Sequence, residues 1–247
     1  MRVTLLGTGS ALPSANRLQA GIHLERNDHH LLVDCGSGVT HRLTQTNIDH
    51  RDVDTVLLTH HHLDHVADLT TLAKARWLEG HPAFTVVGPP GTREICERLF
   101  GIDDLDTRID LEITELDADP APFELGPYRV STAQTKHSKP GFAYRFDDAL
   151  TISGDTAPTR AVAALADGSN VLVHECAYPD GTDTETHSTP SALGRTLADV
   201  DVDVGRVLLT HLFPETEART EDLSETVSQY TDAAVDVASD GDVVTIE

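Results

Sequence analysis

The stretch Thr59-His60-His61-His62-Leu63-Asp64-His65 closes the apolar run Val56-Leu57-Leu58. It lies between a predicted buried strand and a predicted helix, and it holds four potential metal ligands, His60, His62, Asp64 and His65. Nitrogen and carboxylate donors at that density suit a divalent transition metal, with zinc as the default. One ion rarely needs four ligands from so short a loop, and a tight turn aims alternate side chains in two directions. The H-x-H-x-D-H spacing therefore favours two neighbouring ions over a solvated histidine-rich loop.

The composition is strongly acidic. The 247 residues include 41 Asp and Glu against 18 Lys and Arg, which gives a net charge of −23, and the lysines are Lys74, Lys136 and Lys139. Such a surface repels phosphate backbones over long range, which disfavours a general nucleic-acid binder unless high salt screens the charge. An acidic, lysine-poor protein is also what we expect from a salt-accumulating cell. In that case the net charge reflects a halophile-like, high-salt environment and says little about the binding partner.

Secretion and membrane insertion are not expected. Cys35, Cys96 and Cys176 are widely spaced and form no C-x-x-C pair, so they predict neither a disulfide framework nor a cysteine zinc site. The apolar run at residues 3–6 is too short for a signal peptide, and no stretch approaches the ~20 apolar residues of a membrane-spanning helix. We therefore expect a soluble, cytoplasmic protein.

The order of apolar runs and turn residues predicts a layered α/β protein. Strands are predicted at residues 3–6, 21–26, 30–34, 53–58, 83–87, 109–113, 128–135, 142–146, 150–153, 171–173 and 207–210. Helices are predicted after Asp34-Cys35-Gly36-Ser37-Gly38 to about residue 48, at residues 66–78, and from an N-capping Thr92 to Phe100. Gly7-Thr8-Gly9-Ser10 lacks the third glycine and the helix of a dinucleotide-binding turn, so we interpret it as a loop. No linker marks a boundary, and residues 1–247 are expected to form one domain.

Several predicted strands of the second half end on polar side chains. His137 follows residues 128–135, and Asp155 follows residues 150–153. The run Val207-Leu208-Leu209-Thr210-His211 repeats Val56-Leu57-Leu58-Thr59-His60 letter for letter, which suggests two related β/α halves that face each other. Open α/β layers gather their ligands at strand ends. Seven donors result, which divide into two sets that share one carboxylate: His60, His62, Asp64, His65, His137, Asp155 and His211.

The remaining histidines and Asp34 are given no ligand role. His61 is expected to point away from its neighbours in the alternating turn. The other histidines lie in predicted loops or on polar faces and are expected to be solvated: His23, His29, His30, His41, His50 and His81. Asp34 precedes a glycine turn, where a carboxylate usually bonds nearby backbone amides, so a structural role is favoured for it.

Together these motifs resemble the metallo-β-lactamase superfamily, and within it the ribonuclease Z-like branch. Besides the histidine loop and the later donors, the similar motifs are Leu6-Gly7-Thr8-Gly9-Ser10 with Pro13 and Arg17, Asp34-Cys35-Gly36-Ser37-Gly38, Ser153-Gly154-Asp155-Thr156, His174-Glu175 and His187-Ser188-Thr189. The resemblance extends over nearly the whole chain. It implies an αββα sandwich with the metals at one edge of the paired sheets.

The resemblance also implies a role for each site residue. His60, His62 and His137 would bind one ion, Asp64, His65 and His211 the other, and Asp155 would bridge them, with Asp64 also counted among the catalytic residues. The remaining catalytic residues would be His187, which stabilises the transition state or protonates the leaving oxygen, and Glu175, which orients it. The local sequence agrees with a fixed position for His187, because Ser188 or Thr189 can cap a helix that has Pro190 in its first turn. The alternatives are a surface histidine at His187 and a structural hydrogen bond at Glu175.

The departures from the branch concern the substrate. The tRNA-processing members carry a long basic arm between the positions of His137 and Asp155, where only 17 residues lie here. After His211 the chain continues Leu212-Phe213-Pro214-Glu215 instead of Ser-Arg-Tyr. The missing arm and the charge count against tRNA and favour a short metallo-hydrolase.

The resulting hypothesis is a dinuclear Zn²⁺ hydrolase, with Mn²⁺ as the alternative metal. It is expected to act as a phosphodiesterase whose metal-bridging hydroxide attacks a small-molecule or short phosphodiester substrate. Open alternatives are ribonuclease Z activity on tRNA 3′ ends, hydrolysis of a thioester, lactone or sulfate ester, and a non-catalytic metal sensor that retains the fold. The family resemblance is also compatible with a homodimer.

Overall fold

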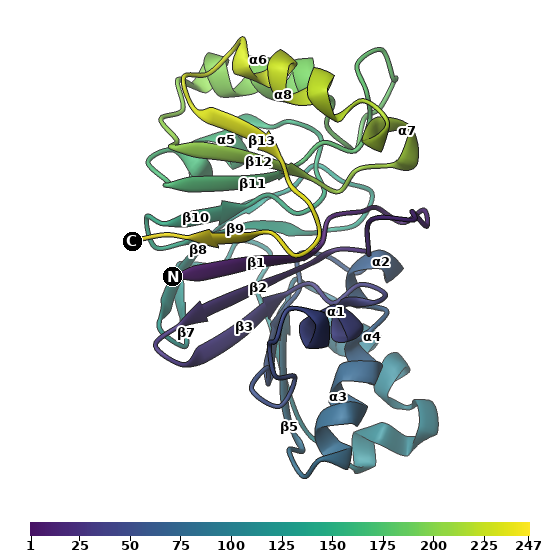
Figure 1. The fold of residues 1–247 in the computed structure, drawn as a ribbon. Coiled ribbons are helices and arrows are strands. Elements are labelled where there is room, and N and C mark those ends of the chain that lie inside the picture. Colours follow the sequence, from purple (N-terminus) through teal and green to yellow (C-terminus); the bar gives the residue numbers. More distant parts are fainter.

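The eleven predicted strands, together with three at residues 123–125, 234–237 and 243–245 that were not predicted, form two seven-stranded sheets. The computed structural model of residues 1–247 stacks these sheets face to face (Figure 1). In spatial order the first sheet contains β14 (Val243–Thr245), β1 (Arg2–Gly7), β2 (Gly21–Arg26), β3 (His29–Val33), β4 (Thr55–Leu57), β5 (Ala83–Gly88) and β6 (Asp110–Glu115). The second contains β13 (Ala234–Val237), β12 (Arg206–Thr210), β11 (Val171–Glu175), β10 (Leu150–Ile152), β9 (Phe142–Phe146), β8 (Tyr128–Gln134) and β7 (Phe123–Leu125).

The two halves repeat one topology. In the first sheet β1, β2 and β3 are antiparallel neighbours, and β4, β5 and β6 continue in parallel. In the second sheet β8, β9 and β10 are antiparallel, and β11, β12 and β13 continue in parallel. An additional antiparallel strand completes each sheet, β14 beside β1 and β7 beside β8. The expected αββα sandwich of two related halves is therefore confirmed.

The five-residue sequence repeat does not align these halves. By strand order β4 corresponds to β11, whereas the repeat matches β4 with β12. Both repeated runs are buried parallel strands that lead into the same edge of the molecule. Strands buried on both faces require similar apolar residues, which accounts for the similar sequences. The repeat therefore pointed to the correct architecture through strands that are not equivalent.

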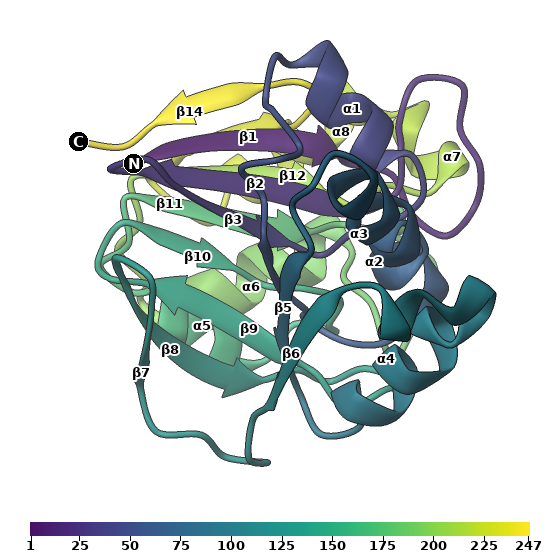
Figure 2. The same ribbon diagram turned by 90° about the horizontal axis from the view of Figure 1, so that it is seen from below.

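Helices cover the outer face of each sheet, as Figures 1 and 2 show. The first half carries α1 (Val39–Gln45), α2 (Leu63–Val66), α3 (Leu69–Leu78), α4 (Thr92–Phe100) and a 3₁₀ helix (Ile102–Thr107). The second carries α5 (Arg160–Ala166), α6 (Pro190–Val200), α7 (Pro214–Glu217) and α8 (Thr220–Ser228). The largest apolar cluster fills the space between the sheets, and two others pack each sheet on its helices. Burying each large aliphatic side chain contributes roughly 1.5–3 kcal/mol.

Two predicted helix starts differ in detail from the structure. The N-cap of α4 is Gly91 in the left-handed region, and the Thr92 hydroxyl donates to the Pro89 carbonyl instead of capping the helix. Helix α6 begins at Pro190 after Thr189 as expected, but no side-chain hydrogen bond caps it. Ser188 instead donates its hydroxyl to the Thr156 carbonyl, which ties the start of α6 to the segment after β10.

The prediction of a solvated His23 is wrong. His23 is fully buried in β2, and its Nε2 lies 2.9 Å from Nδ1 of the partly buried His30. Alternation with Ile22 and Leu24 indicated an outward side chain, but the outer face of the sheet is covered there, since the neighbouring Leu32 packs with α1. Burial and the charge of His30 lower the pKa of His23 to about 3. Among the others, His29, His41 and His81 are exposed as expected and His50 is partly buried.

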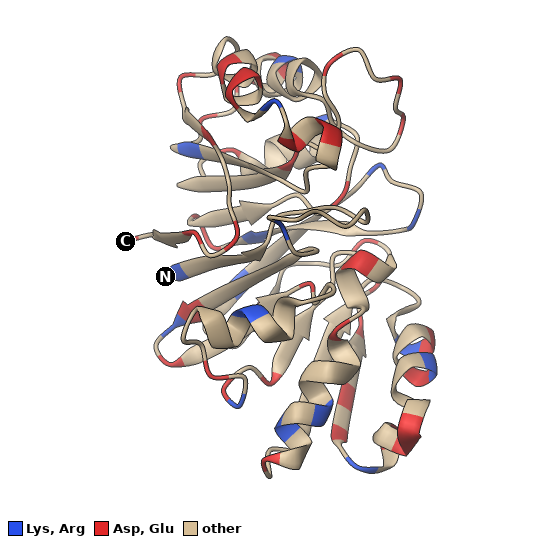
Figure 3. Cartoon of the chain, turned by 45° about the vertical axis from the view of Figure 1, so that its right-hand side comes forward, with Lys and Arg blue, Asp and Glu red and all other residues tan.

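Acidic residues are distributed over the outer helices and loops of both halves (Figure 3). Basic side chains are fewer, and many of them form ion pairs, such as Arg26 with Asp147 and Arg206 with Asp236. None of the helices combines the length and the apolar character that a membrane crossing requires.

Candidate metal centre

All seven predicted donors lie where strands end, at one edge of the paired sheets. His60 and His62 lie between β4 and α2, while Asp64 and His65 belong to α2. The other three come from the second half, where His137 follows β8, Asp155 follows β10 and His211 follows β12. Because the two sheets present these ends toward each other, donors far apart in sequence meet in space.

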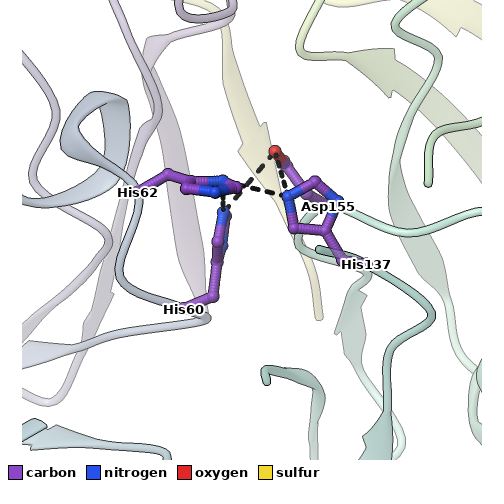
Figure 4. A group of neighbouring side chains, drawn as sticks. All are labelled: His60, His62, His137 and Asp155. Atoms are coloured by element: carbon purple, nitrogen blue, oxygen red, sulfur yellow. Dashed lines mark hydrogen bonds and ion pairs between the residues drawn. The ribbon is translucent and has the colours of Figure 1, made fainter. Parts of the chain in front are cut away.

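The structure divides the donors into two groups that share Asp155. One ligand atom from each residue lies within 4.8 Å of the others in the group His60, His62, His137 and Asp155, and likewise in the group Asp64, His65, Asp155 and His211. Figure 4 shows the first group, in which side chains from the two halves converge. The grouping matches the one that the family resemblance implies.

The nitrogen atoms of the first group are arranged to receive a cation. His137 donates from Nδ1 to the Thr186 carbonyl at 2.9 Å, which leaves its Nε2 with a lone pair. That Nε2 and the Nε2 of His60 each lie 3.0 Å from Nδ1 of His62. A single proton on His62 could satisfy only one of these two contacts, whereas a divalent ion would satisfy all three nitrogens. The residues therefore fit a transition metal with imidazole and carboxylate ligands.

Asp155 faces both groups with different oxygens. Its Oδ2 lies 3.7 Å from Nε2 of His60 and 3.8 Å from Nε2 of His137. Its Oδ1 lies 3.4 Å from Nε2 of His65 and 3.3 Å from Nε2 of His211. Burial opposes ionisation, but the charges of His211, His65 and His60 outweigh it and hold the pKa of Asp155 well below its usual range. An ionised carboxylate thus stands between the two groups.

Asp34 orients one histidine in each group. It accepts hydrogen bonds from Nδ1 of His65 at 2.7 Å and from the Thr59 hydroxyl at 2.7 Å. Since the Thr59 hydroxyl gives its proton to Asp34, its 3.1 Å contact with Nδ1 of His60 must be donated by the imidazole. When neutral, both imidazoles therefore turn a proton-free Nε2 toward the centre. Such carboxylate–histidine contacts fix the tautomer and the ring orientation of metal ligands.

Local backbone conformation supports this arrangement. Asp34 and His211 both have left-handed backbone, with φ of 60° and 59°, and Gly154 before Asp155 has φ of 58°. At Gly154 a Cβ atom would approach the Cβ of Thr59 to 2.8 Å, so only glycine fits this turn beside the centre. Asp and His adopt this conformation more readily than most non-glycine residues, and such positions are often found at functional sites.

His187 and Glu175 form a hydrogen-bonded pair beside the donors. Nδ1 of His187 donates to Oε1 of Glu175 at 2.9 Å, which leaves Nε2 for other contacts. The His187 ring lies 4.8 Å from the His137 ring and 5.8 Å from the His211 ring, measured between centroids. Burial opposes protonation, but the hydrogen bond to Glu175 and its charge outweigh it and raise the pKa of His187.

Glu175 is itself held rigidly. It is 1% exposed and accepts three backbone N–H bonds, from Thr156 at 2.9 Å and from Ala177 and Ser188 at 3.0 Å. These bonds connect the turn that carries Asp155 with the segment that carries His187. The orientation of His187 is therefore coupled to the position of the shared carboxylate.

The sequence pattern did not predict the contacts of Asp34 and Thr59 with the histidine donors. Asp34 does accept the Thr59 backbone N–H at 2.8 Å, as a structural carboxylate would, but its side-chain contacts to His65 and Thr59 were not predicted. The available signal was its place at the end of a predicted strand, next to the one that leads to His60. His61 lies outside both groups, as expected, with Nε2 2.8 Å from the Thr92 hydroxyl.

Replacing Asp34 with alanine is expected to lower the affinity for zinc by about 10–100-fold, because His60 and His65 would lose their orientation. Competition between the protein and a chromophoric zinc chelator measures this affinity. Asp54→Ala is a matched control, since Asp54 is an exposed aspartate at the opposite end of β4. A folded Asp34→Ala protein with unchanged zinc affinity would contradict the orienting role.

Comparison with known proteins agrees with this geometry. The family described as anti-Pycsar protein Apyc1 matches residues 1–224. Ribonuclease Z of Mycolicibacterium gilvum (strain PYR-GCK) is 30% identical over 253 aligned positions, which cover 90% of this chain and 87% of that protein. Ribonuclease Z of Mycobacterium sp. (strain KMS) is 32% identical and covers 87% of this chain and 85% of that protein.

Solved structures share the fold. The metallo-β-lactamase fold protein YhfI from Bacillus subtilis superposes with a TM-score of 0.85 at 24% identity and covers 98% of each chain. The short form of human tRNase Z superposes with a TM-score of 0.80 at 22% identity and covers 100% of each chain. The chain therefore belongs to the family of anti-Pycsar protein Apyc1, within the ribonuclease Z-like branch of the metallo-β-lactamase superfamily, and it is a metal-dependent hydrolase.

Proposed function

We propose that the protein is a phosphodiesterase that works with two divalent ions, with Zn²⁺ as the default and Mn²⁺ as the alternative. The observation that carries the proposal is the shared Asp155, whose two oxygens face two separate groups of donors, with His187 beside both. Relatives named ribonuclease Z support phosphodiester chemistry, because they match over most of both chains.

Each residue then has a defined task. His60, His62 and His137 hold one ion, Asp64, His65 and His211 hold the other, and Asp155 is shared. When bound, the two ions supply a nucleophile at neutral pH and neutralise charge that develops on the phosphoryl oxygens. His187, held by Glu175, carries a proton at Nε2 and delivers it to the leaving oxygen. Asp34 keeps the rings of His60 and His65 aimed at the ions.

The surface near the centre favours a small anionic substrate. Lys136 and Lys139, two of the three lysines, flank His137 and are exposed. Neither of them forms an ion pair, so their charge is available to an incoming anion in a chain whose net charge is −23. Local positive charge at a site mouth raises the concentration of anionic substrates there.

Ribonuclease Z activity on tRNA is the second candidate, and the named relatives favour it. The segment where the tRNA-processing members carry their arm is here only the hairpin of β9 and β10, joined by residues 147–149. An arm that grips the tRNA elbow has no counterpart in that hairpin. The hairpin and the acidic surface favour the smaller substrate.

A substrate panel tests the proposal. With Zn²⁺ or Mn²⁺ the protein is expected to hydrolyse bis(p-nitrophenyl) phosphate and at least one of a cyclic nucleotide and a short oligonucleotide. It is expected to leave a pre-tRNA intact at both low and high salt. Cleavage of pre-tRNA at its 3′ end would support the ribonuclease Z candidate instead. Hydrolysis only of a thioester, lactone or sulfate ester would overturn the proposal.

A further inference from the structure

A polar hollow of about 430 Å³ opens beside His187. Its walls come from the segment before α6 and from the first turns of that helix, and its lining includes Asp180, Asp183, Thr184, Ser191 and Arg195. Only one of its 11 lining residues is hydrophobic, and its volume lies within the range typical of small-molecule sites. The hollow therefore suits a ligand that carries hydroxyl groups and charge.

The walls of the hollow are fixed by hydrogen bonds. Asp180 accepts from the backbone N–H of Ser191 at 3.0 Å and from its hydroxyl at 2.5 Å. Thr184 accepts the backbone N–H of His187 at 3.3 Å. The carboxylate of Asp180 is thus occupied within the wall, and the segment between it and His187 has a defined shape.

Arg195 is the one arginine or lysine side chain that lines the hollow. It is exposed on α6, and its guanidinium forms no ion pair or hydrogen bond, although the chain contains 41 acidic residues. Basic side chains elsewhere are commonly paired, as Arg2 is with Glu25 and Arg145 with Asp148. An unpaired guanidinium has free N–H donors that can bind phosphate or carbonyl oxygens. Asp183 in the same hollow is available to accept hydroxyl protons.

His187 connects this hollow to the metal centre, because it lines the hollow and also contacts the rings of His137 and His211. A phosphoryl group bound between the two donor groups would place its leaving oxygen at His187. The remainder of the leaving group would then extend into the hollow.

We propose that this hollow is the subsite for the leaving group of the substrate and that Arg195 sets its specificity. The inference rests on the proposed phosphodiesterase function. The leaving group would be a polar alcohol that carries a phosphate or carbonyl oxygen, such as a nucleotide, and Arg195 would bind that oxygen. Arg195 acts on the affinity for this group and takes no part in proton transfer.

The kinetic test compares two substrates with Arg195→Gln. For a dinucleotide that retains a terminal phosphate, KM is expected to rise about tenfold with little change in kcat, because one charge-assisted contact is lost. For bis(p-nitrophenyl) phosphate, whose leaving group offers no such oxygen near Arg195, kcat/KM is expected to change less than twofold. Arg195→Lys should recover part of the loss. Arg129→Gln is the matched control, since Arg129 is an exposed, unpaired arginine. It lies at the start of β8, whereas His137 follows the opposite end of that strand.

A binding measurement tests the subsite independently of activity. Isothermal titration of metal-free protein with adenosine monophosphate is expected to give about tenfold weaker binding to Arg195→Gln than to the wild type, with Arg129→Gln unchanged. Equal binding by all three proteins would overturn the subsite, whether or not the protein is a phosphodiesterase. An equal loss of kcat/KM on both substrates would also overturn it. If the wild type hydrolysed neither substrate while the binding difference held, the proposed function would fail and the subsite would remain.

Discussion

Replacing His187 with alanine is expected to lower kcat on a dinucleotide by about 10²–10⁴-fold, the usual contribution of a general acid. The nucleoside alkoxide is a poor leaving group and needs the proton that Nε2 of His187 would deliver. On bis(p-nitrophenyl) phosphate the loss should be clearly smaller, because nitrophenolate leaves without protonation. Steady-state kinetics on the two substrates measure the difference.

Glu175 and His187 should behave as one unit. Glu175→Gln is expected to give a smaller loss than His187→Ala, and the double variant should be no worse than His187→Ala alone. His81→Ala serves as the control, since His81 is exposed and lies outside both donor groups. Metal content should be unchanged in all of these proteins. Full activity of His187→Ala on the dinucleotide, with its metals retained, would contradict the general-acid role of His187.

Replacing Asp155 with alanine is expected to reduce the bound metal from two ions per chain to at most one and to abolish measurable hydrolysis. The reason is geometric, because each carboxylate oxygen of Asp155 faces a different donor group. Elemental analysis of protein dialysed against zinc, together with the rate on bis(p-nitrophenyl) phosphate, measures both effects. Removing any other single donor should affect mainly one ion.

Asp148→Ala is the matched control for this change. Asp148 has a 94% exposed side chain in the β9–β10 turn, on the same hairpin whose last strand leads to Asp155. Its loss should leave metal content and rate unchanged. Two ions per chain in a folded Asp155→Ala protein would contradict the shared role of this carboxylate.

The convergence of the seven side chains could be predicted because they follow short, specific spacings or strand ends in the sequence. His60, His62, Asp64 and His65 lie in one loop, and His137, Asp155 and His211 each follow an apolar run that forms a strand. Residues that follow neighbouring strands at the same edge of a sheet lie close together, and this does not depend on how the individual side chains pack. The hairpin turn between the predicted strands at residues 21–26 and 30–34 is equally local, because Asn27 and Asp28 are typical turn residues, and both adopt the left-handed backbone that such turns require.

Features that depend on tertiary packing could not be predicted in the same way. His23 alternates like a surface residue, and only the helix layer over β2 buries it. Asp34 orients His60 indirectly, through hydrogen bonds to and from the Thr59 hydroxyl. The spacing of these residues in the sequence does not reveal that contact. Thr92 had the composition of an N-cap, but Gly91 with φ of 97° took that position. Strand β14 pairs with β1 across nearly the entire chain, so no local pattern indicated it.

The central claim is that two ions held by these seven donors drive phosphodiester hydrolysis. The most direct test titrates metal-free protein with Zn²⁺ and follows both the bound metal and the rate on bis(p-nitrophenyl) phosphate. We expect the rate to rise until two equivalents are bound and then to level off. Binding of less than one equivalent, with no hydrolysis at any Zn²⁺ or Mn²⁺ concentration, would contradict the claim.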